Sequence, residues 1–355
     1  MSIGSIRTVG FRNLIDNEIQ TDSSSVFLIG ENGQGKTNFL EAVYFCSYAS
    51  SFRSVKDADV VKNGEKDCAV NAHLTDSSFD LVSARIENGK KIVLMDGKRV
   101  EDRKTLLSTI APIVFCHDDM DFVSGTPERR RWFFDQSLCI YDSEYVDELR
   151  KYRKILKTRN SILKERKVNM LEFLDTQLVE SGLKLIHKRK IAVEFFSEVF
   201  LPLYESVSGI GGVSVRYGSS WKNDDRVEIL KFIEEKRESE LDFGSTLSGP
   251  HRDRYSFIRF GTEYAGKAST GQRRLLALLL RATQALRYAH NTGHKPILLL
   301  DDVLLELDPE KRKRFLSVLP DYDQAFFTFL PEEPYERYAK NDTIVYRVEA
   351  GRIHT

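Results

Sequence analysis

The stretch Gly30-Glu31-Asn32-Gly33-Gln34-Gly35-Lys36-Thr37 decides the fold of this 355-residue chain. It matches the pattern G-x-x-x-x-G-K-[ST], in which glycines let backbone N–H groups wrap the phosphate oxygens of a nucleotide. Lys36 would reach the β- and γ-phosphates, and the hydroxyl of Thr37 would bind Mg²⁺. The apolar run 26–29 before the motif predicts a strand, and helical spacing begins after it at Phe39. Strand, loop and helix therefore follow in the order that a site for a nucleoside triphosphate requires.

The elements on either side of this loop can be predicted from the spacing of apolar residues. Strands are expected at 6–9, near Ile19 and at 26–29, and the helix after the loop places Glu41 on a different face from its apolar residues. Residues 79–99 alternate and are interrupted by Asn-Gly and Asp-Gly, dipeptides typical of tight hairpin turns. This segment predicts a small antiparallel sheet.

A second part of the predicted site follows the apolar run 297–300, which is too short for a helix and predicts a buried parallel strand. Asp301, at the end of this strand, would hold Mg²⁺ directly or through water. Asp302 would face the γ-phosphate and act as the general base on the attacking water. The alternative interpretation is an acidic cap after a strand, and the phosphate loop argues against it.

A third motif, Ser269-Thr270-Gly271-Gln272, stands before a helical stripe that runs to residue 290. A helix N-terminus, a serine hydroxyl and glycine N–H groups together form an anion-binding site. A second phosphate site on one nucleotide is of use only if it belongs to the neighbouring subunit of a dimer. On these residues alone, a plain N-cap serine followed by a glycine turn remains an open alternative.

These motifs resemble the ATPase heads of the ABC/SMC type and, more narrowly, the RecF family of bacterial recombination-repair proteins. The narrower resemblance is carried by GTPERRRWFFD at 125–135, GPHRD at 249–253 and LDDVLLELD at 300–308. The chain departs from the family pattern at His117 and Arg254. It also lacks the late histidine of many ABC ATPases, for which Thr328 is the candidate substitute.

The resemblance implies an α/β fold, a P-loop NTPase domain like the ABC-ATPase and SMC heads, with an antiparallel β subdomain and an inserted, mainly helical lobe. It also implies a homodimer that forms with ATP. In that dimer each ATP would lie between Lys36 and Thr37 of one subunit and Ser269, Gly271 and Gln272 of the other, with Asp308 at the dimer seam.

The same resemblance implies a weak, slow ATPase coupled to DNA binding, active in DNA replication, DNA repair and the SOS response to damage. Duplex DNA or gapped and single-strand junctions would be bound, and recombination-mediator proteins that load recombinase would be partners. A full SMC protein is disfavoured because the chain shows no long heptad pattern between Lys36 and Ser269. The alternative from another class is an ATP-dependent dimerising structural or signalling module that binds protein.

The chain is expected to divide into three segments. Residues 1–127 would form the first part of the ATPase head, 128–240 the helical lobe and 241–355 the rest of the head. The lobe is rich in charge and poor in Gly and Pro up to about residue 200, where Pro202 and the glycines at 209–212 are expected to break the helix.

Composition restricts how this protein can bind nucleic acid and where in the cell it can work. Lys and Arg total 53, as do Asp and Glu, so nucleic-acid binding must depend on locally placed charge. The four cysteines lack C-x-x-C spacing, and the sequence MSIGSIRTVG lacks the pattern of a signal peptide, so a reducing, cytoplasmic setting is expected. No apolar run approaches the ~18 residues that span a bilayer, so no membrane association is expected.

The local charge needed for DNA lies between residues 150 and 167, where nine basic residues stand against the single acid Glu165. Such a run can neutralise phosphates without reading the sequence of bases. A second basic cluster follows at 187–190. The alternative is a solvated helix face. The predicted DNA contacts are Arg150, Lys151, Arg153, Lys154, Lys157 and Arg159.

Overall fold

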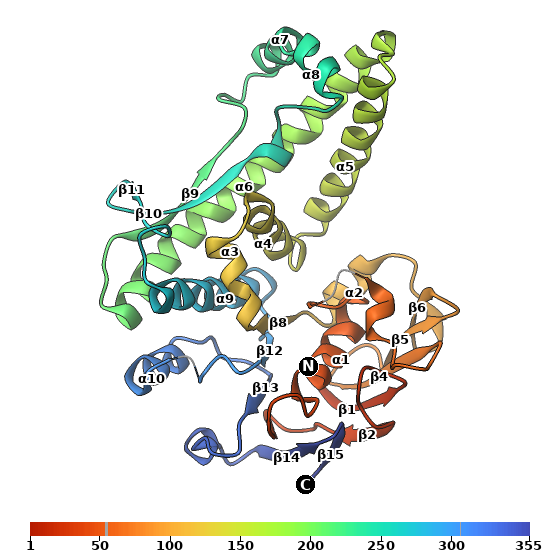
Figure 1. The fold of residues 1–355 in the computed structure, drawn as a ribbon, viewed down its shortest axis with the longest axis vertical. Helices are drawn as coiled ribbons and strands as arrows, with labels where there is room; N and C mark the ends of the chain where they lie inside the picture. The colour runs from red at the N-terminus through yellow and green to blue at the C-terminus, as the bar shows by residue number, and fades with distance from the viewer. Residues whose placement is uncertain (54–55, 306) are drawn as a thin grey trace. The chain divides into compact units, whose positions relative to one another are not determined.

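The computed structural model describes residues 1–53, 56–305 and 307–355. The chain forms two compact units, residues 1–119 with 280–355 and residues 120–279, whose elements are labelled in Figure 1. These units divide the chain after residues 119 and 279, whereas the expected segments divide it after 127 and 240. The assignment of those three segments to parts of an ATPase head stays a prediction.

The first unit is built on a six-stranded sheet in the order β15-β14-β3-β13-β12-β8. All neighbouring strands from β14 to β8 are parallel, and only β15 at the edge is antiparallel. Every residue of β3, β12 and β13 is buried, which explains why these strands are mostly apolar. The strands are β3 (Ser25–Ile29), β8 (Pro112–Phe115), β12 (Ile297–Leu300), β13 (Gln324–Phe329), β14 (Thr343–Glu349) and β15 (Arg352–His354).

A second sheet of this unit is antiparallel, in the order β2-β1-β4-β5-β6-β7. Its last two turns lie at Asn88-Gly89 and Asp96-Gly97, where all four residues have positive φ, as tight hairpins require. The antiparallel sheet predicted at 79–99 is therefore present, as one half of a larger sheet. The strands are β1 (Ser2–Val9), β2 (Asn17–Gln20), β4 (Cys68–Thr75), β5 (Leu81–Glu87), β6 (Lys90–Met95) and β7 (Lys98–Arg99).

Helix α1 (Lys36–Tyr48) contacts both sheets of the first unit, and its apolar residues share one core with them. Because the helix is enclosed on two sides, Glu41 is also fully buried, where it pairs with the guanidinium of Arg12 at 2.7 Å. Glu41 lies on a different face from Phe39 and Val43, as expected, but that face is buried as well, which the sequence did not indicate. The other helices of the unit are α2 (Arg103–Thr109), α10 (Pro309–Ser317) and the second half of α9 (Thr270–Thr292).

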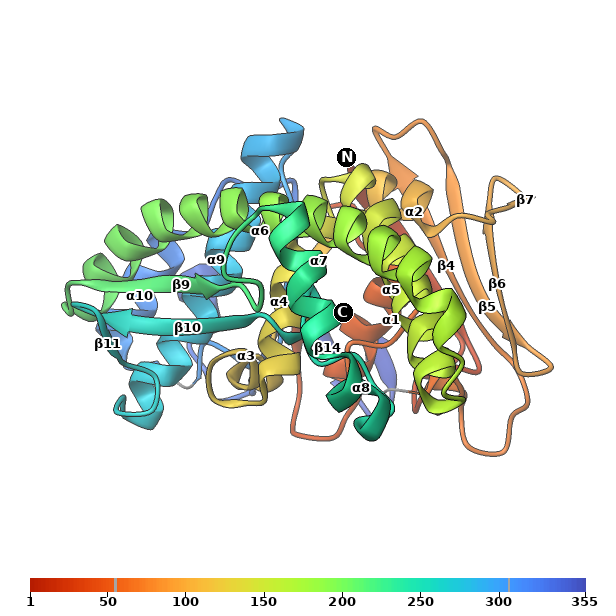
Figure 2. The same ribbon diagram turned by 90° about the horizontal axis from the view of Figure 1, so that it is seen from above.

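The second unit is mainly helical, with one three-stranded sheet in the order β11-β10-β9. Its two long helices, α5 and α6, pack side by side, and α6 also contacts β9 (Figures 1 and 2). The helices are α3 (Asp121–Ser124), α4 (Pro127–Cys139), α5 (Ser143–Lys164), α6 (Leu171–Ser208), α7 (Arg226–Glu235) and α8 (Arg237–Phe243). The strands are β9 (Val213–Gly218), β10 (Arg254–Arg259) and β11 (Thr262–Glu263).

Helix α6 continues through Pro202, which the sequence analysis expected to break it. Proline removes one backbone hydrogen bond of the helix. Phe200 and Tyr204 are fully buried on either side of it, so packing of the apolar face outweighs that loss. The helix ends at Gly209, the first of the glycines that were also expected to break it, and its φ of 73° is the left-handed conformation typical of a helix C-terminus.

A buried arginine joins three helices of the second unit. Arg159 of α5 donates to Asp175 of α6 and to Glu240 of α8, both at 2.6 Å, and to the hydroxyl of Thr246 at 2.8 Å. Its side chain is 0% exposed. The prediction that Arg159 contacts DNA was wrong, because its guanidinium is buried and hydrogen-bonded to carboxylates of the lobe. Charge patterns do not reveal which face of a helix is buried.

We expect Arg159→Ala to destabilise the second unit by about 3–5 kcal/mol, because it removes the cation from the buried carboxylate of Glu240 and leaves Asp175 paired with Arg237 alone. Both tryptophans of the chain, Trp132 and Trp221, lie in this unit, so urea unfolding followed by tryptophan fluorescence measures the change. The control is Arg166→Ala, which removes an exposed ion pair with Asp242 and should cost no more than about 1 kcal/mol. Equal effects of the two changes would contradict the structural role of Arg159.

Candidate functional site

The phosphate loop begins where β3 ends and stops where α1 begins at Lys36. Two of its glycines are required by geometry. A Cβ on Gly30 would lie 2.3 Å from the carbonyl oxygen of Val348 in β14, so no larger residue fits there. Gly35 has a φ of 121°, a conformation that other residues rarely adopt. The loop is therefore held close to the sheet edge and turned sharply into the helix.

Segments far away in the sequence support this loop. The C-terminal hairpin donates two backbone hydrogen bonds to Gln34, from Ala350 to the side-chain oxygen at 2.6 Å and from Gly351 to the carbonyl at 2.8 Å. The amide of Asn13 donates to the carbonyl of Gly33 at 3.3 Å. No sequence motif marked these residues, because their contribution is a contact between distant parts of the chain.

Lys36 lies inside the loop, with only 3% of its surface exposed. Its ammonium donates to the carbonyl oxygens of Gly30 at 2.6 Å and Glu31 at 3.1 Å. An ammonium has three donors, so these two bonds leave the third for a phosphate oxygen. The carbonyls thus hold the cation at the position where the loop turns.

The carboxylate strand meets the phosphate loop at one hydrogen bond. The hydroxyl of Thr37 donates to Asp301 at 2.8 Å, although 264 residues separate them in the chain. The pKa of Asp301 is raised to about 6, mainly by burial and then by the neighbouring charge of Asp302, and the hydrogen bond from the Thr37 hydroxyl opposes this shift. Two oxygen ligands of the kind that Mg²⁺ prefers therefore lie side by side at the sheet edge.

Asp302 has a φ of 51°, in the left-handed region that aspartate tolerates better than most residues. Thr328 at the end of β13 supports this turn. Its hydroxyl accepts from the backbone N–H of Asp302 at 2.8 Å, and it lies 2.8 Å from the carboxylate of Asp302 and 3.2 Å from that of Asp301. The residue singled out as a substitute for a histidine thus contacts both acids.

Sequence reasoning missed two charged residues near this edge. Arg53 donates to Asn38 at 2.8 Å and lies 3.7 Å from Glu41, and its positive charge lowers the pKa of Asp301. Glu333 is 8% exposed. One of its carboxylate oxygens accepts from the backbone of Leu330, and the other has no hydrogen-bond partner among the described residues. Burial raises its pKa. Neither residue belongs to a recognisable motif.

The third motif lies in the second unit and starts α9. The backbone N–H of Ser269 donates to the side-chain oxygen of Gln272 at 2.8 Å, and the backbone N–H of Gln272 donates to the hydroxyl of Ser269 at 3.3 Å. This reciprocal pair is a capping box, which is the simpler of the two interpretations. Because Ser269 and Gly271 are exposed, the same helix start remains accessible to a phosphate from outside.

Asp308 is the exposed N-cap of α10. Its carboxylate accepts from the backbone N–H of Lys311 at 3.0 Å and from the ammonium of the same residue at 2.7 Å, which lowers the pKa of Asp308. Its place at a dimer seam stays a prediction. Glu306, which belongs to the same family motif, lies outside the described residues.

Five of the six predicted DNA contacts are exposed on α5. Arg150, Lys154 and Lys157 have the spacing of one helix face, so their charges lie close together. The second basic cluster is largely structural. Lys188 pairs with Asp142 at 2.7 Å, and Arg189 is buried. The exposed set consists of Arg150, Lys151, Arg153, Lys154 and Lys157.

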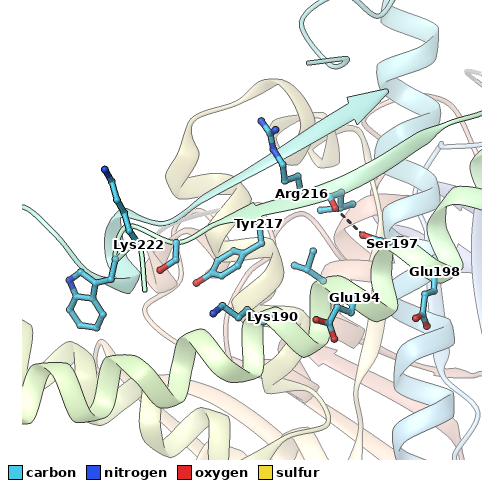
Figure 3. A pocket seen from close by; sticks show the side chains of 11 residues that line it. Lys190, Glu194, Ser197, Glu198, Arg216, Tyr217 and Lys222 are labelled. Carbon is cyan, nitrogen blue, oxygen red and sulfur yellow. Dashed lines mark hydrogen bonds between the residues drawn. The ribbon is translucent and has the colours of Figure 1, made fainter. Parts of the chain in front are cut away.

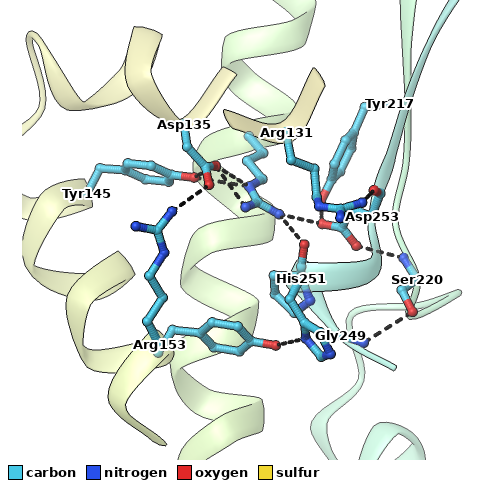
Figure 4. A network of polar contacts seen from close by, with 12 residues as sticks. Arg131, Asp135, Tyr145, Arg153, Tyr217, Ser220, Gly249, His251 and Asp253 are labelled. Atoms are coloured by element: carbon cyan, nitrogen blue, oxygen red, sulfur yellow. Dashed lines mark hydrogen bonds and ion pairs between the residues drawn. The ribbon is translucent and has the colours of Figure 1, made fainter. Parts of the chain in front are cut away.

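Asp135 of the segment 125–135 and Asp253 of the segment 249–253 lie in one polar network of the second unit (Figure 4), in which both pair with Arg189. Its guanidinium pairs with Asp135 and with Asp253, each at 2.8 Å, and donates to the carbonyl of Pro250 at 2.7 Å. Arg131 donates to the carbonyl of Asp253, also at 2.8 Å. These two family motifs therefore join α4, α6 and the start of β10.

The family model described as "RecF/RecN/SMC N terminal domain" matches residues 2–353. A relative from Treponema pallidum, "DNA replication and repair protein RecF", is 42% identical over 348 residues, which cover 98% of this chain and 99% of the relative. The chain belongs to the RecF family. A relative of the same name from Oenococcus oeni is 31% identical over 99% of each chain.

Solved structures agree with this membership of the RecF family. "Structure of the recombination mediator protein RecF-ATP in RecFOR pathway" has a TM-score of 0.88 at 26% identity and covers 99% of this chain and 96% of its own. An Smc head domain from Pyrococcus furiosus has a TM-score of 0.57 at 18% identity, covers 99% of this chain and 94% of its own, and shows a shared fold alone. The expected α/β fold of the ABC and SMC head type is confirmed.

Thr328→Val should destabilise the protein by about 1–3 kcal/mol, because it leaves the N–H of Asp302 without its partner in a partly buried turn. Chemical denaturation followed by far-ultraviolet circular dichroism measures the change. Thr343→Val is the matched control, since its hydroxyl accepts an exposed backbone bond from Lys340 that water can replace. A cost no larger than that of the control would contradict the role assigned to Thr328.

Proposed function

We propose that this chain is an ATP-dependent DNA-binding protein of recombinational DNA repair and replication, acting in the response to DNA damage. The observation that carries the proposal is the 2.8 Å bond between Thr37 and Asp301, which joins the phosphate loop to the carboxylate strand. The names of its RecF relatives, including the RecF-ATP complex, support the same assignment.

ATP with Mg²⁺ is the ligand that these residues fit best. The buried ammonium of Lys36 and the backbone of residues 30–37 would bind the phosphates, and the positive φ angles of Gly33 and Gly35 let the loop take its turns. Thr37 and Asp301 supply two hard oxygen ligands, a number typical of a Mg²⁺ ion that is also bound by phosphates and water. When bound, the metal neutralises charge that develops on the transferred phosphate.

Asp302 would orient the attacking water and take its proton, as a carboxylate beside the γ-phosphate can. The hydrogen bonds of the Thr328 hydroxyl hold the backbone of Asp302 in the left-handed turn and keep the Asp302 carboxylate at the sheet edge. Such a site would hydrolyse ATP slowly to ADP and phosphate. Hydrolysis would act as a timer for release from DNA.

We infer that the working form is a homodimer with ATP between the subunits. Ser269, Gly271 and Gln272 would bind the γ-phosphate on the partner's loop, and Asp308 would lie at the seam. The exposure of Ser269, Gly271 and Asp308 supports this arrangement, because all three remain available to a second subunit. Partners would include recombination-mediator proteins that load recombinase at gaps, in line with the names of the RecF-ATP structures.

DNA would bind along the exposed basic face of α5. This face carries Arg150, Lys154 and Lys157 at helical spacing. Phosphate contacts of this kind are independent of sequence and weaken with salt. The alternative is an ATP-dependent dimerising module that binds protein, which would leave the dimer insensitive to DNA.

A cytoplasmic location follows from the same proposal. Among the described residues, no helix has the length and apolar character needed to cross a membrane.

Light scattering with ATP tests the nucleotide site. Lys36→Met should abolish ATP binding and leave the protein monomeric, because the phosphates lose their cation. Asp302→Asn should still bind ATP but trap the dimer, because the water loses its base. Lys66→Met, at an exposed position of the same unit, serves as the control and should behave as the unchanged protein. Normal ATP turnover in Asp302→Asn would assign the base to another residue.

Charge reversal on α5 tests the DNA surface. The combined change of Arg150, Lys154 and Lys157 to Glu should weaken binding to duplex DNA and lower the salt slope of log K by roughly 3, about 0.9 for each phosphate that is no longer neutralised. Fluorescence anisotropy of a labelled duplex across a salt series measures both quantities.

The matched control reverses three exposed charges of the first unit, where no DNA contact is proposed. Its affinity for duplex DNA should stay close to that of the unchanged protein. Equal weakening in the two triple variants would attribute the effect to net charge and contradict the proposed surface. The control positions are Lys66, Lys98 and Arg99.

A further inference from the structure

A second feature of the lobe has the chemistry of a nucleic-acid site. A pocket of about 410 Å³ lies within the second unit between α4 and α5. This volume is within the range of about 300–1,000 Å³ that is typical of ligand pockets. Arg189 and His251 line it from α6 and from the 249–253 motif. The pocket is distinct from the phosphate loop, which belongs to the other unit.

The charge of this pocket favours an anion. Four arginines and two acids line it, which is an excess of two positive charges. Arg189 is neutralised by its pairing with Asp135. Arg153, by contrast, is 62% exposed and lies 3.6 Å from the same carboxylate, so its guanidinium can turn toward a ligand at the mouth (Figure 4). The side chain of Arg129 is likewise more than half exposed, and it lies 3.5 Å from Asp121. Arg131 pairs with Glu128 at 3.0 Å, so Arg153 and Arg129 are the two arginines best placed to meet a ligand.

An aromatic side chain lies beside these arginines. Trp132 of α4 is 40% exposed, and it stacks against Phe122 with ring centroids 5.6 Å apart at an interplanar angle of 28°. The same side chain lines the pocket. An exposed indole next to arginines is the combination with which proteins bind unpaired bases, because every base has a face that can stack.

Another pocket of the lobe, about 650 Å³ between α6 and β9, fits this ligand less well (Figure 3). Glu194 and Glu198 line it together with its basic residues. The ammonium of Lys190 already pairs with Asp224 at 2.5 Å. Its tryptophan, Trp221, is 2% exposed and so offers no free face to a base.

We propose that the pocket between α4 and α5 takes one nucleotide of an unpaired DNA strand, with its base stacked on Trp132 and its phosphate beside Arg153. The inference rests on the proposed DNA-binding function and specifies its substrate. Arg153 belongs both to the pocket and to the exposed basic run of α5, so a strand that leaves a duplex on α5 reaches the pocket directly. A base inside a duplex could not stack there, because both of its faces are covered.

Tryptophan fluorescence tests this proposal in the full chain with a non-hydrolysable ATP analogue. Because Trp221 is buried, Trp132 should account for most of the quenching that a 15-residue oligo-dT produces. Because Trp132→Ala removes the tryptophan that reports quenching, the variants are compared by fluorescence anisotropy of a labelled oligo-dT. In that measurement Trp132→Ala should weaken oligo-dT binding roughly tenfold, as the loss of one stacked base does, and leave duplex affinity unchanged. Trp132→Phe should keep most of the affinity, since it preserves both the stack and the packing on Phe122.

A pair of variants at two basic residues keeps the proposal testable if Trp132→Ala fails to fold. Arg153→Ala should weaken oligo-dT binding, whereas Lys231→Ala should have little effect, because Lys231 is an exposed residue of α7 that lines neither pocket of the lobe. Free dTMP should not quench at the concentrations at which oligo-dT does, and equal quenching would assign the pocket to mononucleotides and overturn the proposal.

Two further outcomes separate the inference from the proposed function. Duplex binding that depends on the α5 charges, together with oligo-dT binding that is indifferent to Trp132 and Arg153, would overturn the inference alone. Absence of any binding to either form of DNA would overturn both.

Discussion

The hydrogen bond between Thr37 and Asp301 is the contact on which the site depends. It requires β3 and β12 to end at the same edge of one parallel sheet, with β13 between them. Parallel strands place all their carboxyl ends at that edge, so the phosphate loop, both acids and Thr328 converge without further arrangement. Burial at the same edge raises the pKa of Asp301, and a cation bound beside this carboxylate would lower the pKa again.

The second unit depends on buried guanidinium groups. Arg159 and Arg189 each link helices that are distant in the sequence, and each is surrounded by carboxylates. A buried arginine of this kind is costly to desolvate unless its partners are placed with good geometry, so it favours one arrangement of the helices. Much of the family resemblance in segments 125–135 and 249–253 therefore lies in residues that hold the lobe together and shape the pocket beside Trp132.

Where the sequence analysis succeeded, the signal was local. The phosphate loop, the strand at 297–300 and the turns at 88–89 and 96–97 are contiguous patterns whose physics involves only near neighbours. It failed where the outcome depended on distant packing. Pro202 lies within α6 because the apolar face around it is buried, and Glu41 and Arg159 are enclosed by partners far away in the chain.

The sequence by itself determined that a nucleotide loop, a carboxylate strand and a serine-glycine helix start occur in the order of an ABC or SMC head, because each motif is a short run of specific residue types. Only the tertiary structure decided which charges are free. Arg153 and Arg159 stand six residues apart in one basic run, yet the first is exposed beside a pocket and the second is buried. The difference arises from the face of α5 that packs against the lobe, which is a property of its neighbours rather than of the run itself.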